Sequence, residues 1–122
     1  MVIVKKTMTT NKVLFDTIRD LKKLSTKTNV ALWRSVAKIL SKSGSNKSEV
    51  NVSKINKYSN NKETVIIPGK VLGDGKISKN INVIGFSASL MAIEKIKRAG
   101  GNFTLIKDFI KKTPKIKPKI LG

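Results

Sequence analysis

The stretch from Val65 to Gly101 constrains the fold of this chain more than any other segment. It begins with a β-branched run, Val65 to Ile67, which predicts a short strand. We expect Pro68-Gly69 to end that strand, because the pair is typical of a type II turn. Gly73-Asp74-Gly75 indicates a second tight turn, and we expect at least one of its glycines to have a positive φ. Residues 80–83 then alternate polar and apolar side chains, as a half-buried strand does.

A capped helix completes this segment. Ser87 is a suitable N-cap for a helix that runs to Arg98, and Gly100-Gly101 is suited to end it. Lys70 and Lys76 lie at the two predicted turns. The segment has no catalytic group beyond isolated hydroxyls, but backbone amides and ammonium groups on tight loops favour contact with phosphate.

These residues also carry a resemblance. The matching blocks, in chain order, are Lys70, Val71-Leu72, Gly73-Asp74-Gly75, Ile81 to Ile84, Phe86-Ser87, Ala92 and Gly100-Gly101, with Leu32 to Ala37 and Glu49 to Ile55 before them. In this order they resemble the family of large-subunit ribosomal proteins L-fifteen and L-eighteen-e, and its archaeal branch in particular, over about residues 11–122. Leu90, Met91 and Ile93 depart from the pattern, because the family usually has polar or charged residues there.

The resemblance implies an α/β fold: N-terminal helices, then an irregular mixed β-β-α core with glycine-rich turns, then an extended basic C-terminal tail. We expect one domain, divided into segments 1–42, 49–112 and 113–122. It also implies a structural, non-enzymatic role in the large ribosomal subunit, with 23S rRNA and neighbouring large-subunit proteins as partners. No cofactor, membrane, small-molecule substrate or homo-oligomer is expected.

The charge of the chain supports a polyanionic partner independently. The sequence has 26 Lys and Arg residues against 7 Asp and Glu residues, for a net charge of +19. Residues 1–48 carry +9 and residues 49–122 carry +10, so the charge is not confined to a tail. A nucleic acid that contacts much of the surface would neutralise such a distribution.

Several classes of function are disfavoured. The chain has no Cys and no His, which removes disulfides, thiolate metal sites and the commonest general base. A P-loop fails at two positions, because Lys70 stands where its first Gly belongs and Ile77 replaces the Ser or Thr. The carboxylates are scattered, and no pair of them suggests acid–base or metal chemistry. The N-terminal MVIVKK does not resemble a signal peptide, and we expect a cytoplasmic protein.

Two amphipathic helices are predicted before residue 43. Asn11 or Thr10 is a candidate cap for a helix over residues 12–25, whose basic face is either solvated, RNA-facing or bound to a membrane surface. Asn29 is the expected cap of a second helix, 30–42. Trp33 falls on the apolar stripe of this helix, which favours the core. Arg34 lies off the stripe, where it binds a phosphate, forms a surface salt bridge or stays free.

The remaining elements are short. Residues 41–48 predict a hydrophilic linker, 50–52 and 103–106 predict strands, and 107–112 predict one or two helical turns. Ser53 is the expected cap of a helix, 54–58, that Asn60-Asn61 ends, and Tyr58 is either a core or an RNA-facing residue. The two prolines of the tail, 113–122, forbid a helix, and we expect the tail to order only on a partner, with its isoleucines against the protein body.

The candidate RNA-binding residues are basic side chains placed off the apolar stripes, on loops or in the tail. They are Arg34, Lys38, Lys42, Lys47, Lys54, Lys57, Lys70, Lys76, Lys115, Lys117 and Lys119. The alternative function is a free basic nucleic-acid-binding or regulatory protein outside the ribosome.

Overall fold

The computed structural model describes residues 2–43, 49–112 and 118–121, and it describes the backbone alone for residues 2–11 and 42–43. The helices are α1 (Val2–Thr28), α2 (Ala31–Ser43), α3 (Val52–Tyr58), α4 (Leu90–Arg98), α5 (Ile106–Phe109) and the 3-10 turn η2 (Ile110–Lys112). The strands are β1 (Val50–Asn51), β2 (Thr64–Leu72), β3 (Asn82–Ala88), β4 (Asn102–Leu105) and β5 (Lys119–Ile120).

The strands form one sheet in which every described pairing is parallel. The order is β1-β2-β3-β4, and β5 also pairs with β2. β1 pairs with residues 71–72 of β2 and β5 pairs with residues 65–66, so the two short strands share the edge of β2 that β3 does not occupy. The α/β class predicted from the sequence is therefore confirmed, with a parallel sheet at its centre.

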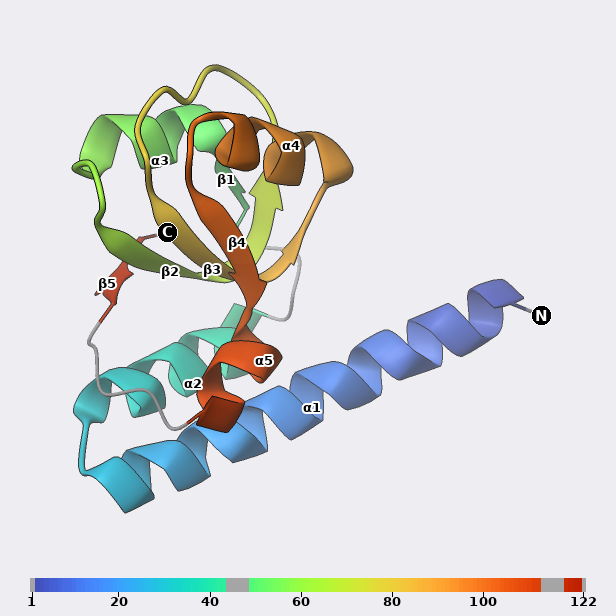
Figure 1. Ribbon diagram of the computed structural model, residues 1–122. Helices are drawn as coiled ribbons and strands as arrows, with labels where there is room; N and C mark the ends of the chain where they lie inside the picture. Colours follow the sequence, from blue (N-terminus) through green and yellow to red (C-terminus); the bar gives the residue numbers. More distant parts are fainter. Residues whose placement is uncertain (1, 44–48, 113–117, 122) are drawn as a thin grey trace.

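Helices cover both faces of the sheet (Figure 1). Side chains alternate between the faces along a strand. Val65 and Ile67 pack with α3 and α4 in one apolar cluster, whereas Ile66 packs with α1, α2 and α5 in the other. A parallel sheet that is buried on both faces needs a continuous apolar run rather than an alternating one, and Val65 to Ile67 supplies it.

The apolar stripes of the two N-terminal helices form most of the second cluster. Leu21 and Leu24 of α1 and Val36 and Leu40 of α2 are buried there. Trp33 is fully buried and its ring centroid lies 6.0 Å from that of Phe109, so the prediction that Trp33 belongs to the core is confirmed.

The boundaries of these helices differ from the predicted ones. α1 begins at Val2, so Thr10 and Asn11 lie inside the helix and do not cap it. Asn29 does not cap α2 either: its φ is +57°, a left-handed conformation between the end of α1 and the first residue of α2, Ala31. Asn is one of the few residues that adopt this conformation readily, which suits it to the turn between two helices.

Pro68-Gly69 does not end its strand. β2 continues to Leu72, and the partners of Ile67 and Lys70 on β3 are Gly85 and Ser87. Three steps along β2 therefore match two along β3, which is a β-bulge. A proline, which cannot donate to the ladder, is tolerated at such an irregularity.

A crossover loop, residues 73–81, connects β2 to β3, because parallel neighbours cannot be joined by a tight turn. Gly75 lies in this loop with a φ of +88°, so the expectation of a positive φ at Gly73 or Gly75 is confirmed. An alanine Cβ at Gly75 would stand 2.3 Å from Cβ of Ser53, which shows how closely the loop approaches α3.

Two predicted caps lie one or two residues from the observed ones. Ser87 belongs to β3, and the N-cap of α4 is Ser89, whose hydroxyl accepts a hydrogen bond from the Ala92 N–H at 3.2 Å. Ser53 lies inside α3, whose N-cap position is Asn51. The end of α4 is as predicted: Gly100 has a φ of +89°, and its N–H donates to the Lys97 carbonyl while that of Gly101 donates to the Ile96 carbonyl, a Schellman motif.

The described part of the C-terminal tail packs on the protein. Lys119 and Ile120 extend β2's edge, the Leu121 N–H donates to the Ile66 carbonyl at 3.0 Å, and the Leu121 side chain is 6% exposed. The expectation that the whole tail orders only on a partner is therefore wrong for residues 118–121, while the expected packing of Ile120 on the body is confirmed. Residues 113–117, with Lys115 and Lys117, lie outside the described residues.

Candidate nucleic-acid interface

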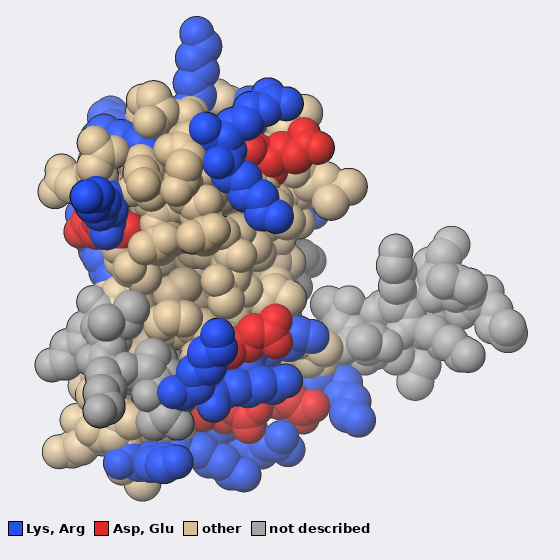
Figure 2. All heavy atoms as spheres, in the orientation of Figure 1, with Lys and Arg blue, Asp and Glu red and all other residues tan. Residues whose placement is uncertain are grey.

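The basic side chains lie on the helices and on the crossover loop. Figure 2 shows them gathered toward the two ends of one face, over α1 and over the helices on the opposite side of the sheet, with uncharged surface between. Of the predicted residues, Arg34, Lys38, Lys54, Lys57, Lys76 and Lys119 are exposed and Lys70 is half-buried. The side chain of Lys42 and the whole of Lys47 lie outside the description.

Arg34 and Lys38 share one face of α2, since residues i and i+4 are neighbours on a helix. Together with Lys22 of α1 and Ser41 they line an open hollow of about 360 Å³. In the part of the chain that the structure describes, none of these three cations has a carboxylate partner. The salt-bridge alternative for Arg34 is therefore not observed.

Arg19 behaves differently from these three. Its guanidinium lies 3.6 Å from a carboxylate oxygen of Asp16 and 3.5 Å from one of Asp20. All three side chains are on the exposed side of α1, where such pairs contribute little stability. The pairing nevertheless neutralises Arg19 locally, so the free positive charge of this region is concentrated on Lys22 and the neighbouring α2.

α3 carries a second basic group, formed by Lys54 and Lys57. Tyr58 beside them is 51% exposed, so it is not a core residue. The Lys57 ammonium lies 5.4 Å from the centroid of the Tyr58 ring, which is within the range of a cation–π contact. An exposed ring next to two lysines gives this helix one surface suited to a base as well as to phosphates.

Three other lysines hold the fold together. Lys95 donates to the carbonyls of Gly73 and Gly75 at 2.6 and 2.7 Å, and Lys79 donates to the Ser59 carbonyl at 2.9 Å. Lys119, predicted to bind RNA, donates to the Tyr58 carbonyl at 2.7 Å. An ammonium group has three N–H groups, so this bond leaves Lys119 able to donate to a phosphate as well.

Asparagines fix the crossover loop that carries Lys76. The Asn56 side-chain oxygen accepts from the Ser78 and Lys79 N–H groups, both at 3.1 Å. The Asn61 side-chain oxygen accepts from the Asn80 N–H at 3.0 Å. Sequence reasoning missed these bonds, because the partners are about 20 residues apart and only the fold brings them together.

The interface also has features that bear on other functions. Among the described residues there is no group of three or more acidic side chains that would hold a metal ion. A separate search of the described helices finds none long and apolar enough to cross a membrane. The large exposed apolar side chains are Phe15, Tyr58, Leu90 and Met91, and two of them, Leu90 and Met91, are departures from the family pattern on α4.

Comparisons with known proteins agree with this architecture. Residues 49–104 match the family described as ribosomal proteins L15 and L18e of the 50S subunit together with their counterpart in the 60S subunit. The chain is 40% identical over 115 residues to "Large ribosomal subunit protein eL18" of Methanothermobacter thermautotrophicus, covering 94% of this chain and 95% of the relative. It is 41% identical to the protein of that name from Methanococcus maripaludis, over 91% of this chain and 92% of the relative. The corresponding protein of Methanospirillum hungatei is 42% identical over 86% of this chain and 87% of the relative. The chain therefore belongs to the eL18 family of large ribosomal subunit proteins, a structural and non-enzymatic class.

Proposed function

We propose that this protein is a structural component of the archaeal large ribosomal subunit, that it acts as one domain in the cytoplasm, and that it binds 23S rRNA as a monomer. The observation that carries the proposal is the net charge of +19, of which the described exposed part lies on helices and loops without carboxylate partners in most positions. Such a surface favours a polyanion, and the family to which the chain belongs favours ribosomal RNA.

The binding residues proposed are the exposed cations on α2, α3 and the crossover loop. They are Arg34, Lys38, Lys54, Lys57 and Lys76, supplemented by Lys42, Lys47, Lys70, Lys115, Lys117 and Lys119. Their role is to neutralise phosphates and release counterions, while the hydrogen-bonded crossover loop holds Lys76 in place. Neighbouring large-subunit proteins are the further partners.

Salt titration tests the proposal. Binding to a large-subunit rRNA transcript, measured by filter retention between about 50 and 200 mM salt, should fall linearly on a log–log plot, by about 10³-fold or more if roughly six phosphates are contacted. A flat plot would contradict an electrostatic interface.

An unrelated RNA of the same length is the control for specificity. Its salt slope should be similar, because counterion release is independent of sequence, but its affinity at physiological salt should be lower. Equal affinities, together with failure of the protein to co-sediment with large subunits, would instead favour the free nucleic-acid-binding alternative.

A further inference from the structure

The groove between the two N-terminal helices combines charge and shape in a way that singles it out. We call it the α1–α2 seam. It consists of Lys22, Ser25, Thr26, Asn29, Ala31, Arg34, Lys38 and Ser41, which line two adjoining open hollows of about 360 and 290 Å³. Arg34 lines both hollows, so they form one groove with Arg34 at its middle. From Ala31 to Ser41 the helix rises about 15 Å, which is the length of the groove along α2.

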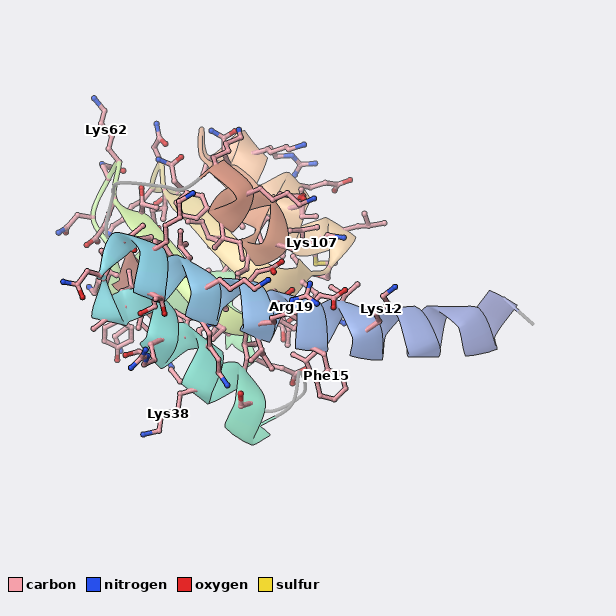
Figure 3. All side chains as sticks on the ribbon, turned by 90° about the horizontal axis from the view of Figure 1, so that it is seen from below. Lys12, Phe15, Arg19, Lys38, Lys62 and Lys107 are labelled. Carbon is pink, nitrogen blue, oxygen red and sulfur yellow. The ribbon has the colours of Figure 1, made fainter. Side chains whose placement is uncertain are left out.

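Only cations carry formal charge among the described residues that line the seam. Lys22, Arg34 and Lys38 line it, and no carboxylate does. The nearest acidic groups on α1, Asp16 and Asp20, are engaged by Arg19. Figure 3 shows Lys38 extending from α2 away from the sheet, so its ammonium is open to a ligand that approaches from outside. The seam is therefore a concave surface with three uncompensated positive charges.

The hydroxyl donors of the seam are already used. Ser25 donates to the Val30 carbonyl at 3.0 Å, Thr26 to the Lys22 carbonyl at 3.2 Å and Ser41 to the Ala37 carbonyl at 2.9 Å. Ammonium and guanidinium groups are thus the main donors left for a ligand. Charged donors without neutral partners beside them suit phosphate oxygens better than the mixed edges of bases.

The core explains why these side chains face outward. α2 turns Trp33, Val36, Ala37 and Leu40 inward, where they are buried. The positions between them, 34 and 38, must then lie on the opposite side of the helix. The described chain offers them no carboxylate, so their charge is left for a partner.

We infer that the α1–α2 seam binds the sugar–phosphate backbone of one rRNA strand, with the fork of Arg34 on a phosphate and Lys22 and Lys38 on its neighbours. This rests on the proposed function but goes further, because it assigns one groove, adds Lys22, and predicts contact with backbone rather than bases. Arg34 is the centre because a guanidinium binds a phosphate through two parallel hydrogen bonds.

The test compares two triple variants that remove the same charge. The seam variant is Lys22→Gln/Arg34→Gln/Lys38→Gln, and the matched control is Lys62→Gln/Lys97→Gln/Arg98→Gln, whose three side chains are also exposed. The seam variant should lower the log–log salt slope by roughly two to three units, and should lower affinity for the rRNA transcript at least about tenfold more than the control. Equal losses in the two variants would overturn the seam, although RNA binding by the wild-type protein would still support the proposed function.

Two further measurements define the ligand. Arg34→Lys keeps the charge but loses the fork, so it should weaken binding by less than the triple variant and by more than no change at all. Hydroxyl-radical footprinting should show one backbone stretch that the wild-type protein protects and the seam variant does not. If the seam variant keeps full affinity and the same footprint on naked rRNA but no longer co-sediments with large subunits, the partner is an acidic protein and the inference is wrong. Thermal unfolding of both triple variants should match the wild type, because all six side chains are exposed.

Discussion

Gly75→Ala tests whether the crossover loop is held against α3 by close packing. Two costs are expected at this position. The φ of +88° strains any residue with a Cβ, at about 1–2 kcal/mol. The new Cβ would also lie 2.3 Å from Cβ of Ser53, and overpacking of this kind costs typically about 1–3 kcal/mol. We therefore expect Gly75→Ala to lower the free energy of unfolding by about 2–5 kcal/mol, the sum of these two ranges.

Gly100 provides a matched control for the strain alone. Its φ is +89°, almost the same, but the nearest atom to an added Cβ is the Asn80 side-chain nitrogen at 3.5 Å, an ordinary contact. Gly100→Ala should therefore cost only about 1–2 kcal/mol. The difference between the two variants isolates the clash with Ser53.

A double-mutant cycle with Ser53→Gly removes the clashing Cβ. Ser53→Gly alone weakens α3 through helix propensity, and the cycle subtracts that effect. The Gly75→Ala change should then cost about 1–3 kcal/mol less in the Ser53→Gly background than in the wild type.

Urea unfolding followed by tryptophan fluorescence is the assay, because Trp33 is the chain's one tryptophan and is fully buried. If Gly75→Ala and Gly100→Ala cost the same, and the cycle shows no coupling, the loop moves away from α3 freely and the reasoning is refuted.

Two other substitutions have matched partners in the chain. Lys95→Met removes two charge-assisted hydrogen bonds to Gly73 and Gly75 and should lower unfolding free energy by about 1–3 kcal/mol, whereas Lys97→Met on the same helix should change it by less than about 0.5 kcal/mol; equal effects would mean that the carbonyl contacts contribute nothing. Leu121→Ala should cost about 2–3 kcal/mol because Leu121 is 6% exposed, and Leu90→Ala, at 81% exposure, should cost almost nothing; a neutral Leu121→Ala in thermal or urea unfolding would show that the C-terminal strand is not part of the folded unit.

The order of the elements could be predicted from local patterns, but several of their ends could not. Pro68-Gly69 carries the local signal of a turn, yet β2 continues through it because β3 pairs with β2 on both sides of the bulge. Ser87 and Ser89 are equally good caps by residue type. The pairing of Lys70 with Ser87 and Val71 with Ala88 keeps Ser87 in the strand and leaves Ser89 to begin the helix. Tertiary pairing that sequence does not display decides each case.

The start of the first helix was missed for a different reason. Thr10 and Asn11 have the side chains of good N-caps, but a cap is needed only where the preceding chain leaves the helix. Residues 2–9 are helical, so the backbone N–H groups that a cap would serve already have partners inside α1. Residue type alone gives no information on whether the upstream segment continues the helix.

Lysines of one residue type divide into two roles that the sequence does not separate. Lys79 and Lys95 donate to backbone carbonyls of distant segments, so removal of their charge should change stability first. Lys22 and Lys38 have no such partner in the described chain and lie with Arg34 in one groove, so removal of their charge should change binding first. The groove exists only because α1 and α2 pack side by side through their apolar stripes, with Asn29 turning the chain between them. The same hydrophobic pattern that is visible in the sequence thus determines the core directly and the basic surface indirectly. Which cations meet across the groove follows from the packing of the two helices and not from their spacing along the chain.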